Sequence, residues 1–174
     1  MNKKGDIWIS AVLYLGLGLL VLTMILSAGM PLVEKLKDKN VISQTKTLFF
    51  TVDENIRAVT NEGPGSRRLL TPFEVGKGDM YVEENRIRWA MKTPVKIMEK
   101  GILMREGALV LAQNETTIVD EYLMNVYLDY DKVAKLQLNS EYDNPFQGIY
   151  GFAIINTGQF DATTRLPIVS IEIK

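Results

Sequence analysis

The sequence predicts an α+β protein in which a long N-terminal helix, first transmembrane and then amphipathic, precedes an antiparallel β-sandwich-like head domain. Three features predict this fold: an uncharged apolar run near the N-terminus, an apolar stripe at helical spacing, and alternating apolar and polar residues after residue 62. The 174 residues suffice for one globular domain plus an apolar segment and are too few for two full domains.

The apolar run from Ile7 to Leu26 contains neither a charged residue nor a proline. As a helix it spans about 30 Å, which matches the hydrocarbon core of a bilayer. It is also longer than the apolar region of an ordinary removable signal peptide, the alternative interpretation. Lysines flank both ends of the run, so charge counting alone does not set its orientation. The short N-terminal tail and a later glycosylation signal favour a cytoplasmic N-terminus.

A single apolar stripe continues the helix beyond the membrane segment. Its members recur at spacings of three and four, which is typical of a helix with one buried face. They are Val41, Thr45, Leu48, Val52, Ile56 and Val59, widened by Phe49. The run of Gly and Pro at 63–65 predicts the end of the helix.

The remaining residues predict short strands, because apolar side chains now recur at every second position. Alternation over 86–91, 122–130 and 134–139 predicts three strands, and 102–112 predicts a hairpin turning at 105–107. The nearly continuous apolar run 149–155 predicts a central strand, and 169–173 predicts a last one. Many short strands in about a hundred residues favour a sandwich or a rolled antiparallel sheet.

The composition argues against catalysis and against several classes of ligand. The chain has no His and no Cys, which removes the commonest general base, the thiolate nucleophile and the usual zinc and haem ligands. We therefore predict no enzyme activity, no cofactor and no metal. A net charge of −1 without a basic stripe argues against nucleic acid as a partner. Without disulfides, an exported head must rely on its hydrophobic core.

Few polar motifs remain as candidate sites. Asn114 begins the triplet Asn-Glu-Thr, which matches the N-glycosylation acceptor pattern. The acidic pairs Asp129/Asp131 and Glu141/Asp143 could bind calcium, but each lies at a predicted turn and neither has calcium-loop spacing. We expect solvated turns at both pairs.

The N-terminus resembles that of type IV pilins and their archaeal relatives, the archaellins and pilin-like proteins. The resemblance lies in Lys3, Lys4 and Gly5, followed directly by the helix that starts at Asp6. In that family a short basic leader ends in Gly, and a dedicated prepilin-type peptidase cuts just after it. Many family members carry Glu at the fifth mature position, whereas this chain has Ser10. That difference puts the family's mode of subunit docking in doubt here.

The resemblance implies a structural subunit of a type IV pilus-like filament or of a related secretion machine. It implies a leader (1–5), a transmembrane helix (6–33), an amphipathic extension (34–62) and an extracytoplasmic β domain (63–174). The expected partners are membrane lipid, copies of the chain or other pilin-like subunits, and the prepilin-type peptidase. The expected location is the cell membrane, single-pass with the C-terminal domain outside, or a cell-surface filament. The alternative is a single-pass anchored β domain that binds a ligand and does not polymerise.

Overall fold

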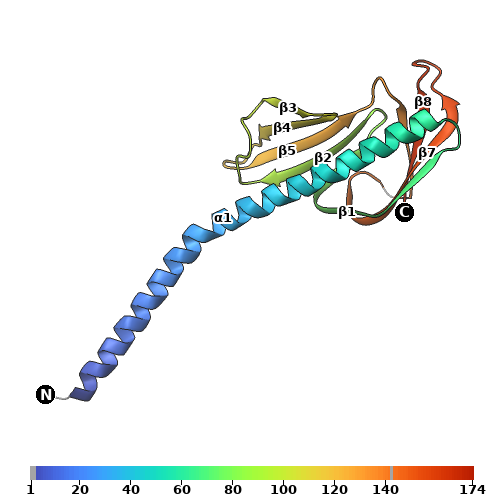
Figure 1. Ribbon diagram of the computed structural model, residues 1–174. Coiled ribbons are helices and arrows are strands. Elements are labelled where there is room, and N and C mark those ends of the chain that lie inside the picture. The colour runs from blue at the N-terminus through green and yellow to red at the C-terminus, as the bar shows by residue number, and fades with distance from the viewer. Residues whose placement is uncertain (1–2, 142) are drawn as a thin grey trace. The chain divides into compact units, whose positions relative to one another are not determined.

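The computed structural model is an α+β protein with one long N-terminal helix followed by an eight-stranded, mostly antiparallel sheet (Figure 1). This confirms the predicted fold class. The structure describes the backbone of residues 3–141 and 143–174, and the side chains of residues 8, 10–141 and 143–174. The chain divides into two compact units, residues 1–39 and residues 40–174. The second unit is called the head below.

The helix α1 (Lys3–Glu62) ends where the glycine run predicts, and its last turn is capped by the head. Gly63 adopts a φ of +93°, a left-handed conformation that favours glycine at a helix C-terminus. The carbonyl oxygen of Val59 accepts hydrogen bonds from the Ser66 hydroxyl at 2.7 Å and from the Asn156 amide at 3.1 Å. Asn156 is buried, so strand and helix satisfy each other's polar groups away from solvent.

The strands occur in the regions that the alternating pattern predicts, with one addition near residue 70. They are β1 (Arg67–Val82), β2 (Arg86–Thr93), β3 (Leu103–Glu106), β4 (Leu109–Glu115), β5 (Tyr122–Asp129), β6 (Lys135–Ser140), β7 (Phe146–Phe160) and β8 (Pro167–Ile173). Their order across the sheet is β3-β4-β5-β2-β1-β7-β8-β6. Among the described residues, β6 and β8 form the one parallel pair. The run 149–155 is central, as predicted, because β7 pairs with both β1 and β8.

Strand β1 was not predicted, and it bends sharply within the sheet. Its register against β7 shifts between Val75 and Met80, and it pairs with β2 only from Asp79 onward. Gly78 lies in this bend with a φ of +84°. Beside it, the Trp89 indole N–H donates a hydrogen bond to the carbonyl of Lys77 at 2.8 Å. The bend lets one strand belong to two differently directed halves of the sheet.

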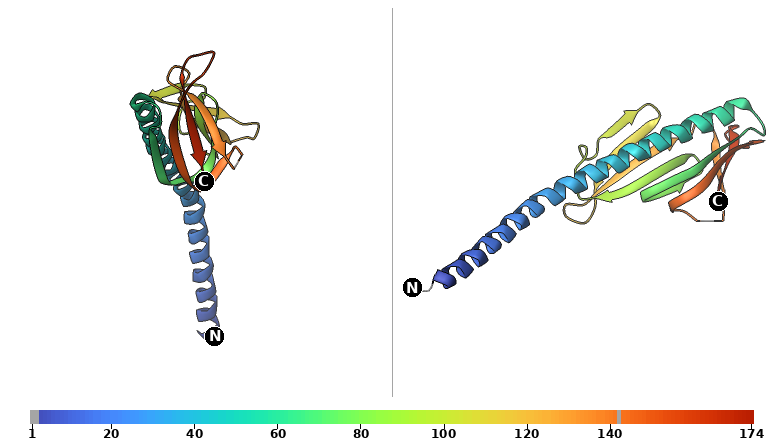
Figure 2. Two further views of the ribbon diagram at one scale, coloured as in Figure 1. Left: turned by 90° about the vertical axis from the view of Figure 1, so that its right-hand side faces the viewer. Right: turned by 60° about the horizontal axis from the view of Figure 1, so that its bottom comes forward.

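The head has one hydrophobic core, which lies between the curved sheet and residues 42–59 of α1 (Figure 2). The predicted stripe supplies the helical side of this core: Phe49, Val52, Ile56 and Val59 are at most 1% exposed. Val41 and Leu48 are partly buried against it, and Ile42 is an unpredicted member. Each fully buried aliphatic side chain contributes about 1.5–3 kcal/mol through removal of its surface from water.

We predict that Val52→Asp destabilises the head by several kcal/mol, because it places an unpaired charge in the centre of this core. The matched control is Thr51→Asp, which adds the same charge at the exposed neighbouring position. Thermal unfolding of the full-length chain in detergent measures both variants. Equal melting temperatures for the two variants would show that α1 does not pack on the sheet as described.

We also predict that Gly78→Ala costs at least about 2 kcal/mol, since it combines left-handed strain with a steric clash. A Cβ at this position would lie 2.6 Å from the Ala90 carbonyl oxygen. Gly76→Ala is the control, because its Cβ would meet only the Glu74 carboxylate at 3.7 Å. Urea unfolding compares the two substitutions. A Gly78 variant as stable as the Gly76 variant contradicts the described bend.

Candidate functional site

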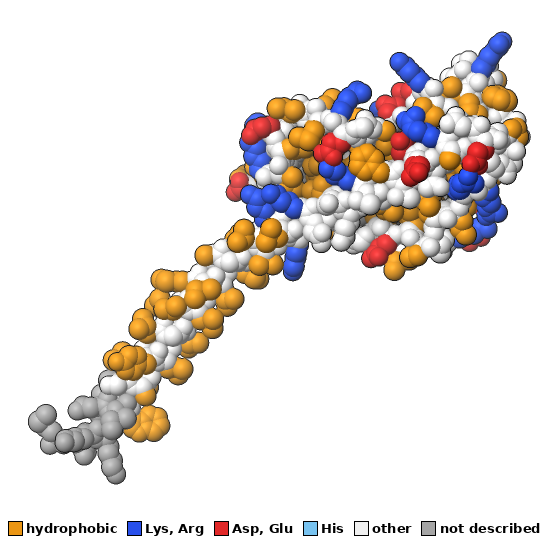
Figure 3. Space-filling model, in the orientation of Figure 1, with side chains coloured by type: hydrophobic (Ala, Val, Ile, Leu, Met, Phe, Trp, Pro, Cys, Tyr) orange, Lys and Arg blue, Asp and Glu red, His pale blue; other side chains and the backbone are white. Residues whose placement is uncertain are grey.

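The first part of α1 presents an apolar surface on all sides. Trp8 and the residues from Ser10 to Lys37 are exposed, apart from the partly exposed Gly29. Figure 3 shows hydrophobic side chains over the visible face of this segment. An exposed apolar surface of this extent is rare in water and marks contact with lipid or with another protein. Helix α1 is long and apolar enough to cross a membrane, so it is a candidate membrane anchor.

The predicted leader forms the beginning of the same helix. The backbone of Lys3, Lys4, Gly5 and Asp6 is helical. The side chains of residues 3–7 lie outside the described part of the chain, as do residues 1 and 2 entirely. Ser10, the residue at the family's Glu position, is exposed. The cleavage site therefore stays a prediction from sequence.

Gly16 and Gly18 lie in the middle of the apolar segment. A Cβ added at either position would have no neighbour within 4 Å. Because two residues separated by two positions point to nearly opposite faces of a helix, each glycine removes side-chain bulk from a different face. At each of these positions another helix could approach closely.

Asn114, the candidate glycosylation acceptor, is the second-last residue of β4 and is exposed. Its neighbour Gln113 is fully buried, and the Gln113 side-chain oxygen accepts hydrogen bonds from the backbone N–H groups of Ile97 and Met98. The acceptor amide therefore lies on the solvent face of the strand. This exposed position is compatible with modification.

The two acidic pairs are the candidates for calcium binding that the sequence offers. The Asp129 carboxylate accepts a hydrogen bond from the Asp131 backbone N–H at 3.2 Å and forms an ion pair with Arg86 at 3.3 Å. Burial raises the pKa of Asp129, but these two donors outweigh burial and the pKa is lowered overall. The Asp131 carboxylate accepts a hydrogen bond from the Asn85 side-chain amide. No group of three potential metal-ligating side chains occurs among the described residues, and local turn bonding accounts for the first pair.

Sequence reasoning missed Asp161, whose pKa is held well below its usual range by the Thr164 backbone N–H and the Lys135 ammonium. The distances to these donors are 2.8 Å and 3.0 Å. The Asp161 carboxylate also accepts a hydrogen bond from the Thr163 backbone N–H. Because every contact lies in the β7–β8 turn or on β6, the carboxylate closes a turn and ties it to the sheet edge. The Asp-Ala-Thr-Thr sequence is the signal that could have revealed it.

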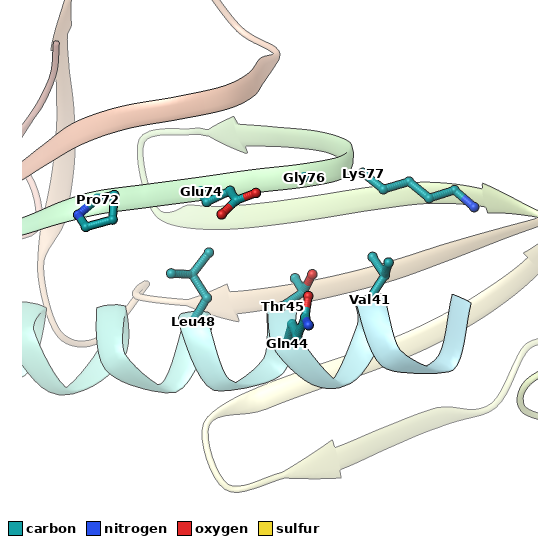
Figure 4. A pocket seen from close by; sticks show the side chains of 8 residues that line it. All are labelled: Val41, Gln44, Thr45, Leu48, Pro72, Glu74, Gly76 and Lys77. Carbon is teal, nitrogen blue, oxygen red and sulfur yellow. The ribbon is translucent and has the colours of Figure 1, made fainter. Parts of the chain in front are cut away.

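A groove of about 530 Å³ lies on the head between α1 and the bend of β1 (Figure 4). Val41, Gln44, Thr45 and Leu48 line it from the helix, and Pro72, Glu74, Gly76 and Lys77 line it from β1. Its volume is in the range of small-molecule sites. It contains one carboxylate and one ammonium but no nucleophile beyond a threonine hydroxyl. Chemically, the groove can accept a polar group or a side chain.

No protein-family model, no curated protein and no solved structure matches this chain. The exposed apolar helix and the groove are therefore the observations on which a functional proposal rests.

Proposed function

We propose that this chain is a structural, pilin-like subunit of an extracytoplasmic filament or of a related secretion machine. The supporting observation is one continuous helix, α1, with two kinds of surface. Residues 10–33 carry no charge and are exposed apart from the partly exposed Gly29, whereas residues 42–59 bury a single stripe in the β head. The apolar part of such a helix can insert into lipid while the part that packs on the sheet keeps the folded head outside the bilayer.

Assembly in this proposal exchanges one apolar environment for another. The apolar part of α1 is stable in lipid, and it is equally stable in a bundle of identical helices, where van der Waals packing replaces contact with lipid. The small residues Gly16 and Gly18 permit close approach in such a bundle. The β head supplies the outer surface and the lateral contacts. A prepilin-type peptidase acts first, cutting after Gly5 and removing Lys3 and Lys4.

The second candidate is a single-pass anchored binding module, and the groove between α1 and β1 favours it. In this function the groove on the head takes a ligand, and the helix only holds the head at the membrane. Ser10 also suits this candidate, since it lacks the carboxylate that many pilins carry there. The two candidates differ in processing: the filament subunit is cut before Asp6, and the anchored module keeps its N-terminus.

We predict that the full-length chain fractionates with membranes or filaments and resists extraction by high salt, because apolar insertion is not an electrostatic attachment. Carbonate and 1 M-range salt washes followed by detergent extraction measure this, with a peripheral membrane protein as control. Recovery of the full-length chain in the soluble fraction without detergent would contradict both candidate functions.

Processing is the sharper test of the filament candidate. We predict that the mature N-terminus is Asp6, and that Gly5→Val blocks cutting, because a branched residue hinders entry of an extended backbone into a narrow active site. The same variant should form no filaments, since the uncut leader carries two lysines into a lipid-free bundle without partners. Gly29→Val is the control, because it makes the same change beyond the leader where the structure has open space.

Intact mass measurement of the native protein gives the N-terminus, and electron microscopy shows whether filaments form. A native protein that begins at Met1 or Asn2 removes the filament candidate and leaves the anchored module.

A further inference from the structure

Two neighbouring segments of the head expose large apolar side chains that its core does not use. At the tip of the β4–β5 loop, Ile118 is 59% exposed and Val119 is 87% exposed. At the start of the edge strand β3, Ile102 just before the strand is 54% exposed, and Leu103 and Met104 within it are 59% and 45% exposed. These five residues are called the apolar rim. Runs of exposed apolar residues on an edge strand invite association unless something covers them.

Both segments of the rim lie at one end of the sheet. Thr93 at the end of β2 and Glu115 at the end of β4 both pair with Tyr122 at the start of β5. The β2–β3 loop reaches the same place, since the Gly101 backbone N–H donates to the Gln113 carbonyl at 3.0 Å. The β4–β5 tip and the start of β3 therefore leave the sheet side by side.

This end of the sheet is the end at which α1 enters the head. In Figure 1 and in the right-hand view of Figure 2, the loops joining β2 to β3 and β4 to β5 lie beside the first turns of the head's part of α1. Farther along the helix, the opposite end of β3 is held by an ion pair between Lys46 and Glu106. The rim thus lies at the end of the head that contains residue 40, where the head's part of α1 begins.

The distance along the chain from the apolar segment to the rim is short. The uncharged sequence ends at Val33, and the head begins at Asn40. Seven helical residues span about 10 Å. The headgroup layer on each side of a bilayer is about 5–8 Å thick. If the apolar segment is in lipid, the entry end of the head is therefore at or next to the headgroups.

The charges around the rim are balanced. Lys92, Lys96 and Lys100 form ion pairs with Glu121, Glu99 and Glu115 at 3.7, 2.8 and 2.9 Å, respectively. All six side chains belong to the loops and strand ends of the same end of the sheet. A basic surface would bind anionic lipid by charge. The three ion pairs carry no net charge, so the apolar residues of the rim supply the rim's own attraction to a membrane.

We propose that the apolar rim is a lipid-contact surface that seats the head on the membrane, with Ile118 and Val119 entering the headgroup layer. The proposal rests on the membrane anchor described above and holds for either candidate function. Seating fixes the head at the membrane surface while the subunit is anchored. It also covers the exposed edge strand β3, which would otherwise be free to pair with another chain.

Single-cysteine variants test the proposal cleanly, because the chain contains no cysteine. Val119→Cys places a fluorescent probe on the rim, and Leu20→Cys places one in the apolar segment. Ala162→Cys is the matched control: it is exposed on the β7–β8 turn, at the other end of the head in Figure 1. Each full-length protein is reconstituted in phosphatidylcholine vesicles with and without a lipid that carries a spin label near its headgroup.

The expected result is quenching of the Val119 probe at least twofold greater than that of the Ala162 probe. Because the rim is apolar and its charges are balanced, quenching should be the same in 50 mM and 500 mM salt and in vesicles with added phosphatidylglycerol. The Leu20 probe should be quenched only by a spin label placed deeper in the acyl chains. This combination supports both the anchor and the seated head.

Four other outcomes overturn the proposal. If the Leu20 probe reports lipid and the Val119 probe reports water, the anchor stands and the seated head fails. A Val119 probe that is shielded from aqueous iodide but not quenched by lipid shows that a second copy covers the rim. If no probe reports lipid, the anchor fails and the seated head fails with it. Equal quenching at positions 119 and 162 would show that contact with the membrane is not directed by the rim.

Discussion

The side chains of Phe49, Val52, Ile56 and Val59 fill the concave side of the sheet, and the sheet depends on them for its shape. Strands β1 and β2 pair over only four residues, from Asp79 to Val82. The two halves of the sheet on either side of this short seam would have little to hold them at a fixed angle. The buried stripe of α1 packs into one core with residues from both halves. Packing against the helix therefore supplies the rigidity that backbone hydrogen bonding lacks at the seam.

This arrangement also explains why one helix carries two unlike surfaces. From Ser10 to Val33 the sequence carries no charge on any face, which is the pattern of a helix that contacts an apolar environment on every face. From Ile42 to Val59 only one face meets the sheet, and the other faces carry exposed polar residues such as Glu54. Because both parts share one hydrogen-bonded backbone, the transition needs no linker.

The sequence predicts the helix and most strands because their periodicity is strong, and it fails where periodicity is broken. Strand β1 contains Pro72, Gly76 and Gly78, which are signals for turns, and its register shifts interrupt the alternation. The groove between β1 and α1 depends on that bend, so it could not be foreseen either. The parallel pairing of β6 with β8 joins segments far apart in sequence, and no local pattern encodes it. The glycosylation motif at Asn114 and the leader motif at 1–5 come from the sequence alone. Glycosylation and leader cleavage stay predictions, because both depend on other enzymes and not on the fold.

The place of β8 in the sheet has a consequence for how the chain acquires its structure. Strand β6 precedes β7 in sequence, yet it reaches the sheet only through β8, which lies between them. During synthesis, β6 must therefore wait unpaired until residues 167–173 have emerged. Pairing between strands that are distant in sequence is slow, and the unpaired edge of β6 is open to mispairing in the meantime. Strands β1 to β5 can pair before β8 is made, but the edge that contains β6 is completed only by the last strand.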